Sequence, residues 1–148
     1  MARTPIPTWN FALVLVRMGR RFALVHERKH GQLWYLPAGR VEPGESFVTA
    51  AKRETREEAG IDVVVEGIVR IEHLPLPDNA RMRMIFVARP ADDTPLRTEP
   101  DEESLGAAWF TVEEMSTVPL RSEEVRALAQ AVLDGAPVCP LSLYAIGG

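Results

Sequence analysis

The sequence predicts an α/β fold in which a mixed β-sheet lies between α-helices. Three observations predict it. Apolar, β-branched segments gather at the start of the chain and again after its middle, a helical pattern separates the two groups, and a second amphipathic pattern follows the last strands. Elements in this order pack as layers around a common core. The chain has 148 residues, 46% of them hydrophobic, which suits a single domain spanning residues 1–148.

The first strands are expected to form a hairpin. Residues 8–17 are rich in Phe, Val and Leu, residues 18–20 form a tight turn, and residues 21–27 return as the second strand. Residues 33–36 form a short apolar strand. Residues 43–44 are Pro-Gly, which indicates a turn before the next element.

A helix is predicted between Ser46 and Gly60. Ser46 is a suitable N-cap, and Gly60 is a suitable residue just beyond the C-terminal end, where a left-handed conformation is common. Phe47, Ala50 and Ala51 form an apolar stripe at helical spacing. This stripe defines the face that we expect to lie against the sheet.

The next two turns of the same stripe carry glutamates. Glu54, and then Glu57 and Glu58, occupy positions where core residues are expected. Like charges at this spacing destabilise a helix by roughly 0.2–0.5 kcal/mol per pair. A hard divalent cation removes that conflict, and Mg²⁺ prefers a few carboxylates together with waters and phosphate oxygens. Arg53 precedes Glu57 by four residues, so we expect an ion pair that holds this carboxylate in place.

After this helix the chain is expected to add three strands and one helix. Residues 61–74 are β-branched and form one long or bent strand. Residues 81–89 alternate at first and then become continuously apolar, as in a sheet strand, and residues 107–112 form a short strand. An amphipathic helix covers residues 125–133 and ends at Gly135.

Composition and charge argue against several classes of partner. The formal net charge is −4 and the arginines are scattered, so a nucleic acid polymer is not expected as a partner. No stretch of about 18 uncharged apolar residues exists, so no membrane contact is expected either. The start of the chain lacks an apolar signal core and Cys139 is the only cysteine, which together predict a cytoplasmic location.

The acidic segment resembles the Nudix box of the MutT-like hydrolases. The matching pattern is Gly39-x5-Glu45-x7-Arg53-Glu54-x2-Glu57-Glu58-x-Gly60-Ile61. One position departs from the family pattern: the residue after Glu54 is usually a bulky aliphatic and here it is Thr55. We expect Thr55 to lie at the edge of the inner helix face and to change the packing there, with no loss of chemistry.

The resemblance implies the Nudix fold and a Mg²⁺-dependent hydrolase, in which Mn²⁺ is able to substitute. It implies that the box glutamates bind the cation and that the Gly39 carbonyl adds a ligand. Members of the family also supply an acid from a loop before the last strands. Glu103 is our first candidate for it, as metal ligand or general base. The catalytic set implied by the resemblance is Arg53, Glu54, Glu57, Glu58 and Glu103.

Candidate substrates and states of assembly also follow from the resemblance. Several other segments are similar to the 8-oxo-guanine nucleoside diphosphatase branch and to a bacterial branch acting on nucleoside and thiamine-precursor pyrophosphates: residues 34–40, 86–90, 103–109 and 119–121. A nucleoside di- or triphosphate is therefore the expected substrate, with an oxidised guanine nucleotide among the candidates. The alternative is a Nudix-like module that binds or senses a nucleotide without turnover. A homodimer is a further expectation.

Overall fold

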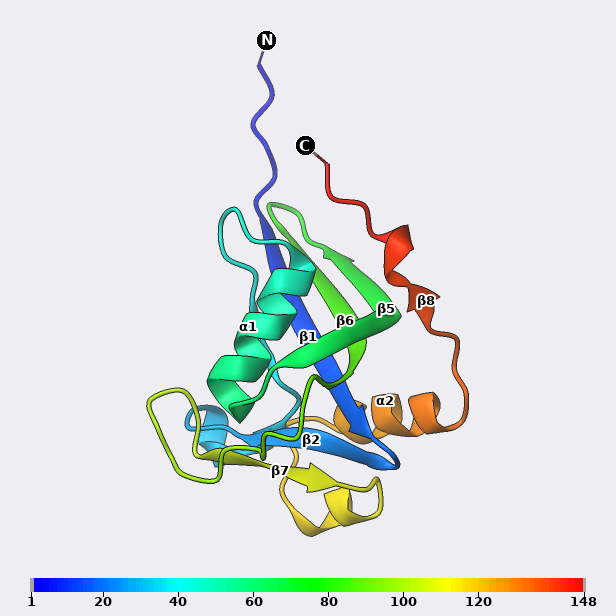
Figure 1. Cartoon of the computed structure of the whole chain (residues 1–148). Helices are drawn as coiled ribbons and strands as arrows, with labels where there is room; N and C mark the ends of the chain where they lie inside the picture. Colours follow the sequence, from blue (N-terminus) through cyan, green and yellow to red (C-terminus); the bar gives the residue numbers. More distant parts are fainter. Residues whose placement is uncertain (1, 148) are drawn as a thin grey trace.

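The computed structural model describes residues 2–147 and contains one mixed β-sheet with a helix on each face (Figure 1). The helices are α1 (Phe47–Ala59) and α2 (Glu124–Leu133). Short 3₁₀ turns occupy His30–Gln32, Glu114–Thr117 and Leu141–Leu143. The strands are β1 (Thr8–Met18), β2 (Arg21–His26), β3 (Trp34–Tyr35), β4 (Ala38–Arg40), β5 (Val63–Pro75), β6 (Ala80–Pro90), β7 (Gly106–Phe110) and β8 (Cys139–Pro140).

The strands are ordered β3-β2-β1-β6-β5-β8, with β4 beside β1 and β7 beside β2. β1 and β6 run parallel at the centre, and the other ladders within the named strands are antiparallel, which makes the sheet mixed as expected. β5 follows β6 along most of its length with irregularities near Gly67 and Val69, so the predicted bent strand is confirmed. Bends of this kind increase the twist of a long strand pair.

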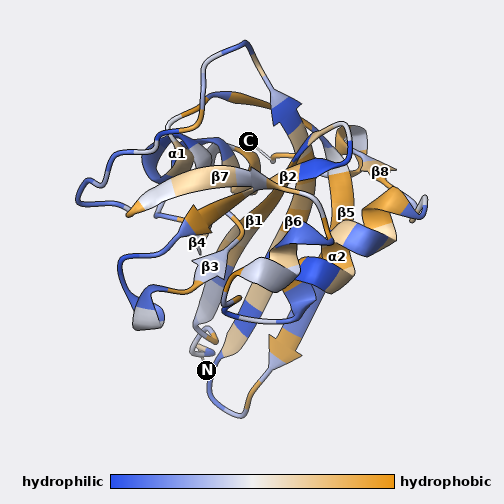
Figure 2. Ribbon diagram, turned by 90° about the horizontal axis from the view of Figure 1, so that it is seen from below, coloured by the Kyte–Doolittle hydropathy of each residue, from blue (hydrophilic) through white to orange (hydrophobic). Residues whose placement is uncertain are grey.

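Alternate residues of β1 reach opposite faces of the sheet, and each face has its own core. Ala12, Val14 and Val16 pack on the side of α1, together with Ala50 and Ala51 of that helix. The residues between them pack on the side of α2, in a cluster that includes Leu13, Leu15, Val125, Leu128 and Ala129. Figure 2 shows the apolar central strands between the two helices, so the α/β/α arrangement predicted from the sequence is confirmed.

Both ends of α1 are fixed as the sequence predicts. The Ser46 hydroxyl accepts a hydrogen bond from the Thr49 amide at 3.1 Å. Gly60 adopts φ 78° and its amide donates to the Arg56 carbonyl at 3.0 Å. A Cβ atom at this position would lie 2.9 Å from Cβ of Arg97, so glycine serves both the turn and the close approach of the neighbouring chain.

The expectation that Thr55 lies at the edge of the inner face of α1 is wrong. Thr55 is fully buried, and its hydroxyl donates to the Ala51 carbonyl at 2.8 Å. That bond satisfies the polar group inside the core. The buried stripe of α1 therefore continues through Thr55 and Ala59, and the glutamates lie beside the stripe, where Glu54 and Glu58 reach the surface of a cleft.

Within residues 2–147, no helix is both long enough and apolar enough to cross a membrane. The chain after α2 returns to the sheet as β8, which pairs with β5 at Gly67. It continues to Tyr144, whose hydroxyl accepts the Phe47 amide at 3.0 Å. This segment closes the outer side of the sheet next to the start of α1.

Candidate active site

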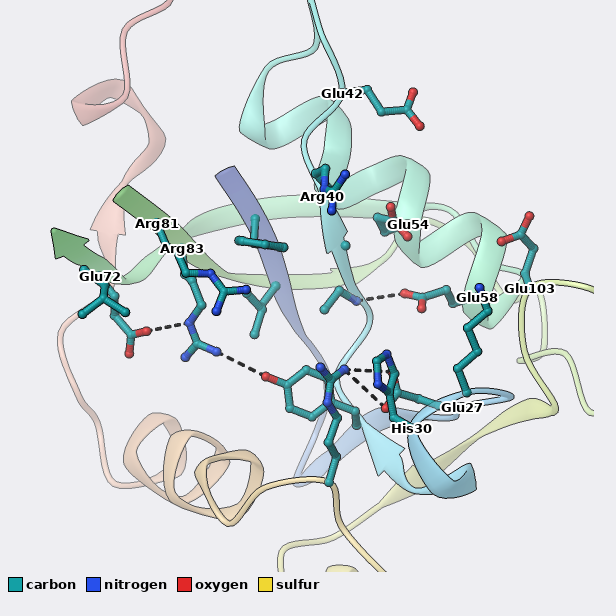
Figure 3. A pocket seen from close by; sticks show the side chains of 18 of the residues that line it. Glu27, His30, Arg40, Glu42, Glu54, Glu58, Glu72, Arg81, Arg83 and Glu103 are labelled. Carbon is teal, nitrogen blue, oxygen red and sulfur yellow. Dashed lines mark hydrogen bonds and ion pairs between the residues drawn. The ribbon is translucent and has the colours of Figure 1, made fainter. Parts of the chain in front are cut away.

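A cleft of about 1450 Å³ opens along the sheet, between α1, β4, the outer halves of β5 and β6 and the loop after β2 (Figure 3). Acidic side chains gather at the end formed by α1, and arginines line the opposite wall. The carboxylates at the α1 end include Glu54, Glu58 and Glu103. The box helix, the loop around Gly39 and the loop carrying Glu103 thus meet at one place, as the sequence predicts.

Arg53 holds three carboxylates of the box. Its guanidinium donates to Glu45 at 2.7 and 2.9 Å, to Glu54 at 2.8 Å and to Glu57 at 3.1 Å. The hydrogen bonds from Arg53 lower the pKa of Glu45. The expected ion pair between Arg53 and Glu57 is confirmed. Glu45 accepts two of these bonds and is the main partner of Arg53.

Glu58 is the most deeply placed of the box carboxylates. Its Oε1 atom accepts the Ala38 amide at 2.9 Å. Burial raises the pKa of Glu58 to about 9, against the opposing effect of the Ala38 amide, and the charge of Glu54 acts in the same direction as burial. Burial also raises the pKa of Glu54, while Arg53 opposes that shift. Two carboxylates that are costly to ionise side by side are suited to a bound cation.

Gly39 permits a close approach between the box loop and the helix. A Cβ atom at Gly39 would overlap the Glu54 carboxylate, which would have to move to make room for it. The space that a methyl group would fill is therefore occupied by a carboxylate. Glycine at this position allows the Glu54 carboxylate to lie against the main chain, and its role is one of packing, since its φ is not in the left-handed region.

The predicted acidic residues differ in whether they line the cleft. Glu103 lines the cleft, and its charge contributes to the raised pKa of Glu54 and of Glu58. Glu57 is half-exposed, faces Arg53 and does not line the cleft. Among residues 2–147, no three Asp, Glu, His or Cys side chains are arranged as a closed metal-binding group. The ligand roles of Gly39, Glu54, Glu57, Glu58 and Glu103 therefore stay predictions.

The chemistry of the donors nevertheless fits a hard divalent cation. Glu54, Glu58 and Glu103 supply only oxygen atoms, which are the ligands that Mg²⁺ prefers. Each of these charges raises the cost of ionising its neighbours, and a cation among them would offset that repulsion. The residues present at this end of the cleft thus fit the cation that the resemblance implies.

The loop that carries Glu103 is shaped by Asp101. One carboxylate oxygen of Asp101 accepts the amides of Glu103 at 2.8 Å and of Ser104 at 3.1 Å. This turn is typical of aspartate, and the sequence signal for it was the Asp-x-x-Ser spacing. The Asp101 carbonyl in turn accepts Nε of Arg28 at 2.9 Å, which joins the loop to the segment after β2.

A buried clamp ties this loop to the end of α1. The Ser104 hydroxyl donates to the Glu58 carbonyl at 2.7 Å. Arg97 donates through one nitrogen to the carbonyls of Glu57 and Glu58, at 2.9 and 3.1 Å, and to the Ser104 hydroxyl at 2.8 Å. These bonds satisfy carbonyls at the helix end that have no partner within the helix. Sequence reasoning missed both Arg97 and Ser104.

The wall opposite the box is built around Arg83. Its guanidinium donates to Glu72 at 2.6 Å and to the two oxygens of Glu124 at 2.7 and 3.0 Å. The Tyr35 hydroxyl also donates to Glu124. The hydrogen bonds from Arg83 lower the pKa of Glu124. Arg121 lies over the Tyr35 ring at 4.7 Å, so cation–π contact completes this wall.

Comparison with known proteins assigns the chain to a family. The NUDIX domain family model matches residues 7–131. Human 8-oxo-dGDP phosphatase NUDT18 is 41% identical over 99 residues, which cover 66% of this chain and 29% of that protein. The phosphatase NudJ of Escherichia coli is 31% identical over 114 residues, which cover 72% of this chain and 73% of NudJ. The match thus spans less than a third of the length of NUDT18.

Solved structures show the same fold. A NUDIX hydrolase from Nitrosomonas europaea superposes with a TM-score of 0.79 at 24% identity, covering 95% of this chain and 97% of that one. A MutT protein from Methanosarcina mazei superposes with a TM-score of 0.64 at 22% identity, covering 89% and 97%. With the box residues gathered at one cleft and the family match extending from β1 into α2, the chain belongs to the NUDIX domain family.

Proposed function

We propose that this chain is a hydrolase that cleaves a diphosphate bond in a nucleoside diphosphate linked to a further group, with Mg²⁺ as its cation and Mn²⁺ able to substitute. The observation that carries the proposal is Glu58, a largely buried carboxylate with a raised pKa beside Glu54, at the end of a cleft of about 1450 Å³. A cation bound beside such a carboxyl would favour its ionised form, and a cleft of this size accommodates a nucleotide.

The proposed chemistry divides among the residues of the box. Mg²⁺ bound here would polarise the phosphoryl oxygens and lower the pKa of a water molecule. Glu54, Glu58 and the Gly39 carbonyl would hold the cation, with Glu57 as a further ligand on the outer side. Glu103, which lines the same cleft, would act as general base toward the attacking water or complete the ligand set.

Arg53 acts through other residues in this scheme. Its bonds to Glu45, Glu54 and Glu57 fix the directions in which the box carboxylates point. Because an acidic site loses affinity when its ligands are free to turn away, a positioning cation of this kind contributes to metal binding without touching the metal.

The similarity to NUDT18 supports a nucleoside di- or triphosphate as substrate, with an oxidised guanine nucleotide as the first candidate to test. The similarity to the phosphatase NudJ also supports a hydrolase, since the match covers most of the length of NudJ. A nucleotide-binding module without turnover is the alternative. The cytoplasmic location and the homodimer stay predictions, the second of which light scattering on the purified chain tests directly.

The test is phosphate and pyrophosphate release from a substrate panel with Mg²⁺ or with EDTA. The panel holds ordinary and 8-oxo guanine nucleotides, nucleotide sugars, ADP-ribose and a thiamine-precursor pyrophosphate. We expect metal-dependent release, and loss of at least about 100-fold in Glu58→Gln, since a displaced cation removes both water activation and charge stabilisation. Glu66→Gln, an exposed change on β5 away from the cleft, is the control. Full activity of Glu58→Gln contradicts the proposal, and tight binding without release favours the sensing module.

A further inference from the structure

The arginines of the cleft differ in whether they already have an anionic partner. Arg83 is bound by two glutamates, Arg70 pairs with Glu72 at 2.7 Å, and Arg121 pairs with Glu27 at 3.2 Å. Carboxylates therefore neutralise much of the positive charge along this wall. A guanidinium that already donates to carboxylates has fewer N–H groups free for an incoming anion.

Arg28, which also lines the cleft, donates to the Asp101 carbonyl at 2.9 Å. Arg40 and Arg81 differ from these four arginines. Within residues 2–147, neither guanidinium forms an ion pair or a side-chain hydrogen bond. Both side chains line the main cleft, and both also line a smaller pocket of about 300 Å³ that adjoins it. Their charges are therefore available to a ligand that reaches this end of the cleft.

Aromatic rings hold these two side chains in place. The Arg40 guanidinium lies 4.3 Å from the centre of the Trp9 ring, and that of Arg81 lies 5.0 Å from the centre of the Phe11 ring. Stacking occupies the flat face of a guanidinium and leaves its N–H edge free. Both arginines are exposed, and the stacking favours one orientation of each side chain, which reduces the entropy lost on binding.

The sheet register places the two cations on either side of one strand. Arg40 on β4 pairs with Phe11 of β1, and Arg81 on β6 pairs with Trp9 of β1. Figure 3 shows Arg40 on the side nearer to Glu54 and Arg81 across β1 from it. A group lying over this part of β1 is therefore within the reach of two unpaired cations, next to the acidic end of the cleft.

We propose that Arg40 and Arg81 form an anion subsite that binds a phosphate group of the substrate beside the predicted cation site. The inference rests on the proposed function for the identity of the substrate. Guanidinium N–H groups match phosphate oxygens in geometry and charge, and bonds between such ionised groups are about twice as strong as neutral ones. The subsite gives a polyanionic substrate a place to bind in a cleft whose other end is acidic.

The test measures the binding of sodium pyrophosphate in the presence of EDTA, by calorimetry and by the change in Trp9 fluorescence. The Trp9→Phe variant identifies which part of the fluorescence comes from Trp9. We expect Arg40→Ala and Arg81→Ala each to weaken binding about tenfold or more. Arg89→Ala is the matched control: it is exposed, lies on the same strand as Arg81 and does not line the cleft. Arg89→Ala and Glu58→Gln should bind pyrophosphate at least as well as the unmodified chain.

The same variants are then compared in turnover of the substrate found with the panel. We expect Arg81→Ala to raise KM about tenfold with kcat little changed, because the lost contact is made in the ground state as well. Absence of pyrophosphate binding in EDTA, or equal binding by Arg40→Ala and Arg81→Ala and the unmodified chain, overturns the subsite. Since that measurement needs neither cation nor turnover, failure of the subsite is distinguishable from failure of the hydrolase proposal.

Discussion

Gly39 and Arg53 together determine where the Glu54 carboxylate lies at the acidic end of the cleft. The absence of a side chain at Gly39 allows the Glu54 carboxylate to lie against the main chain. Arg53 holds the same carboxylate from the other side at 2.8 Å. The position of Glu54 is therefore determined by a missing methyl group on one side and by a charged donor on the other.

Gly39→Ala is expected to displace the Glu54 carboxylate, because a flexible side chain yields more readily than the two backbones that would otherwise have to separate. We expect Mn²⁺ affinity, followed by electron paramagnetic resonance, to fall about tenfold. The melting temperature should change little in comparison. In a chain that already carries Glu54→Gln, the Gly39→Ala change should have little further effect on Mn²⁺ affinity. An unchanged Mn²⁺ affinity in Gly39→Ala would show that Glu54 is not a ligand.

Arg53→Lys tests whether Mg²⁺ binding depends on one side chain that bonds to three carboxylates at once. Arginine bonds to Glu45, Glu54 and Glu57 at once, whereas a lysine ammonium lacks the planar fork that reaches all three. We expect the Mg²⁺ concentration for half-maximal activity to rise several-fold, while kcat at saturating Mg²⁺ is largely retained. A fall in kcat that high Mg²⁺ does not restore would instead indicate that Arg53 contacts the substrate.

Contacts within the box helix were predictable from the sequence, and contacts between distant segments were not. The pair of Arg53 and Glu57 follows from helical spacing, which places residues four apart on one side. Ser104 and Arg97 reach the end of the helix from about forty residues further along the chain. No local pattern specifies such a meeting, which depends on how the sheet brings the two segments together.

At the scale of elements, α1 and the Glu103 loop behave as one connected unit. Arg97 and Ser104 bind the carbonyls of Glu57 and Glu58, so the backbone that carries two box glutamates also anchors the loop opposite them. The spacing between the helix and Glu103 is thus fixed by buried hydrogen bonds. Movement of the loop would require those carbonyls to lose their partners.

Ser104→Ala and Thr55→Ala form a matched pair that tests this connection. Each removes a buried hydroxyl that donates to a carbonyl of α1, at about 1 kcal/mol of stability. Only Ser104 also joins the helix to the loop. We expect the two variants to lose similar free energy of unfolding in urea, but only Ser104→Ala to lower kcat. In a chain that already carries Glu103→Gln, Ser104→Ala should not lower kcat further. Equal activity of the two variants would mean that the clamp does not position Glu103.

The capped helix and the hairpin could be predicted because their signals are local. The strands β4 and β8 were not, since each forms only through its partner and, unlike the similarly short β3, lies outside an apolar segment. β4 forms where Gly39 and Arg40 run beside β1, and β8 forms where the end of the chain meets Gly67 of β5. Short segments of this kind have too little periodicity to be recognised before the sheet is known.

At the scale of the whole molecule, the Glu124 side chain joins α2 to the cleft through Arg83 and Tyr35. The Arg83 hydrogen bonds lower the pKa of Glu124 below its ordinary value of 4.5. A lowered pKa in the folded state stabilises the fold at pH values above 4.5, and this contribution is lost as the pH falls through the folded pKa. The link between helix and cleft is therefore weakest in acid.

Glu124→Gln removes that titration while keeping the shape of the side chain. We expect the variant to have a lower free energy of unfolding than the unmodified chain at pH 7, and the difference to shrink as the pH falls well below 4. Urea unfolding at several pH values measures it. Glu123→Gln, whose side chain is largely exposed beside Arg126, is the control. A difference that is the same at every pH would show that the charge of Glu124 does not contribute.

The parallel pairing of β1 with β6 has a consequence for how the chain folds. The hairpin of β1 and β2 and the box helix form from neighbours in sequence, but the central ladder joins Thr8 to Ala80 and cannot form until everything between them has been ordered or looped out. Long-range pairings of this kind slow folding because chain entropy is lost before contacts compensate for it. We therefore expect the local contacts of the box helix to form before the β1–β6 ladder, and the floor of the cleft, with any capacity to hold a ligand, to form together with that ladder.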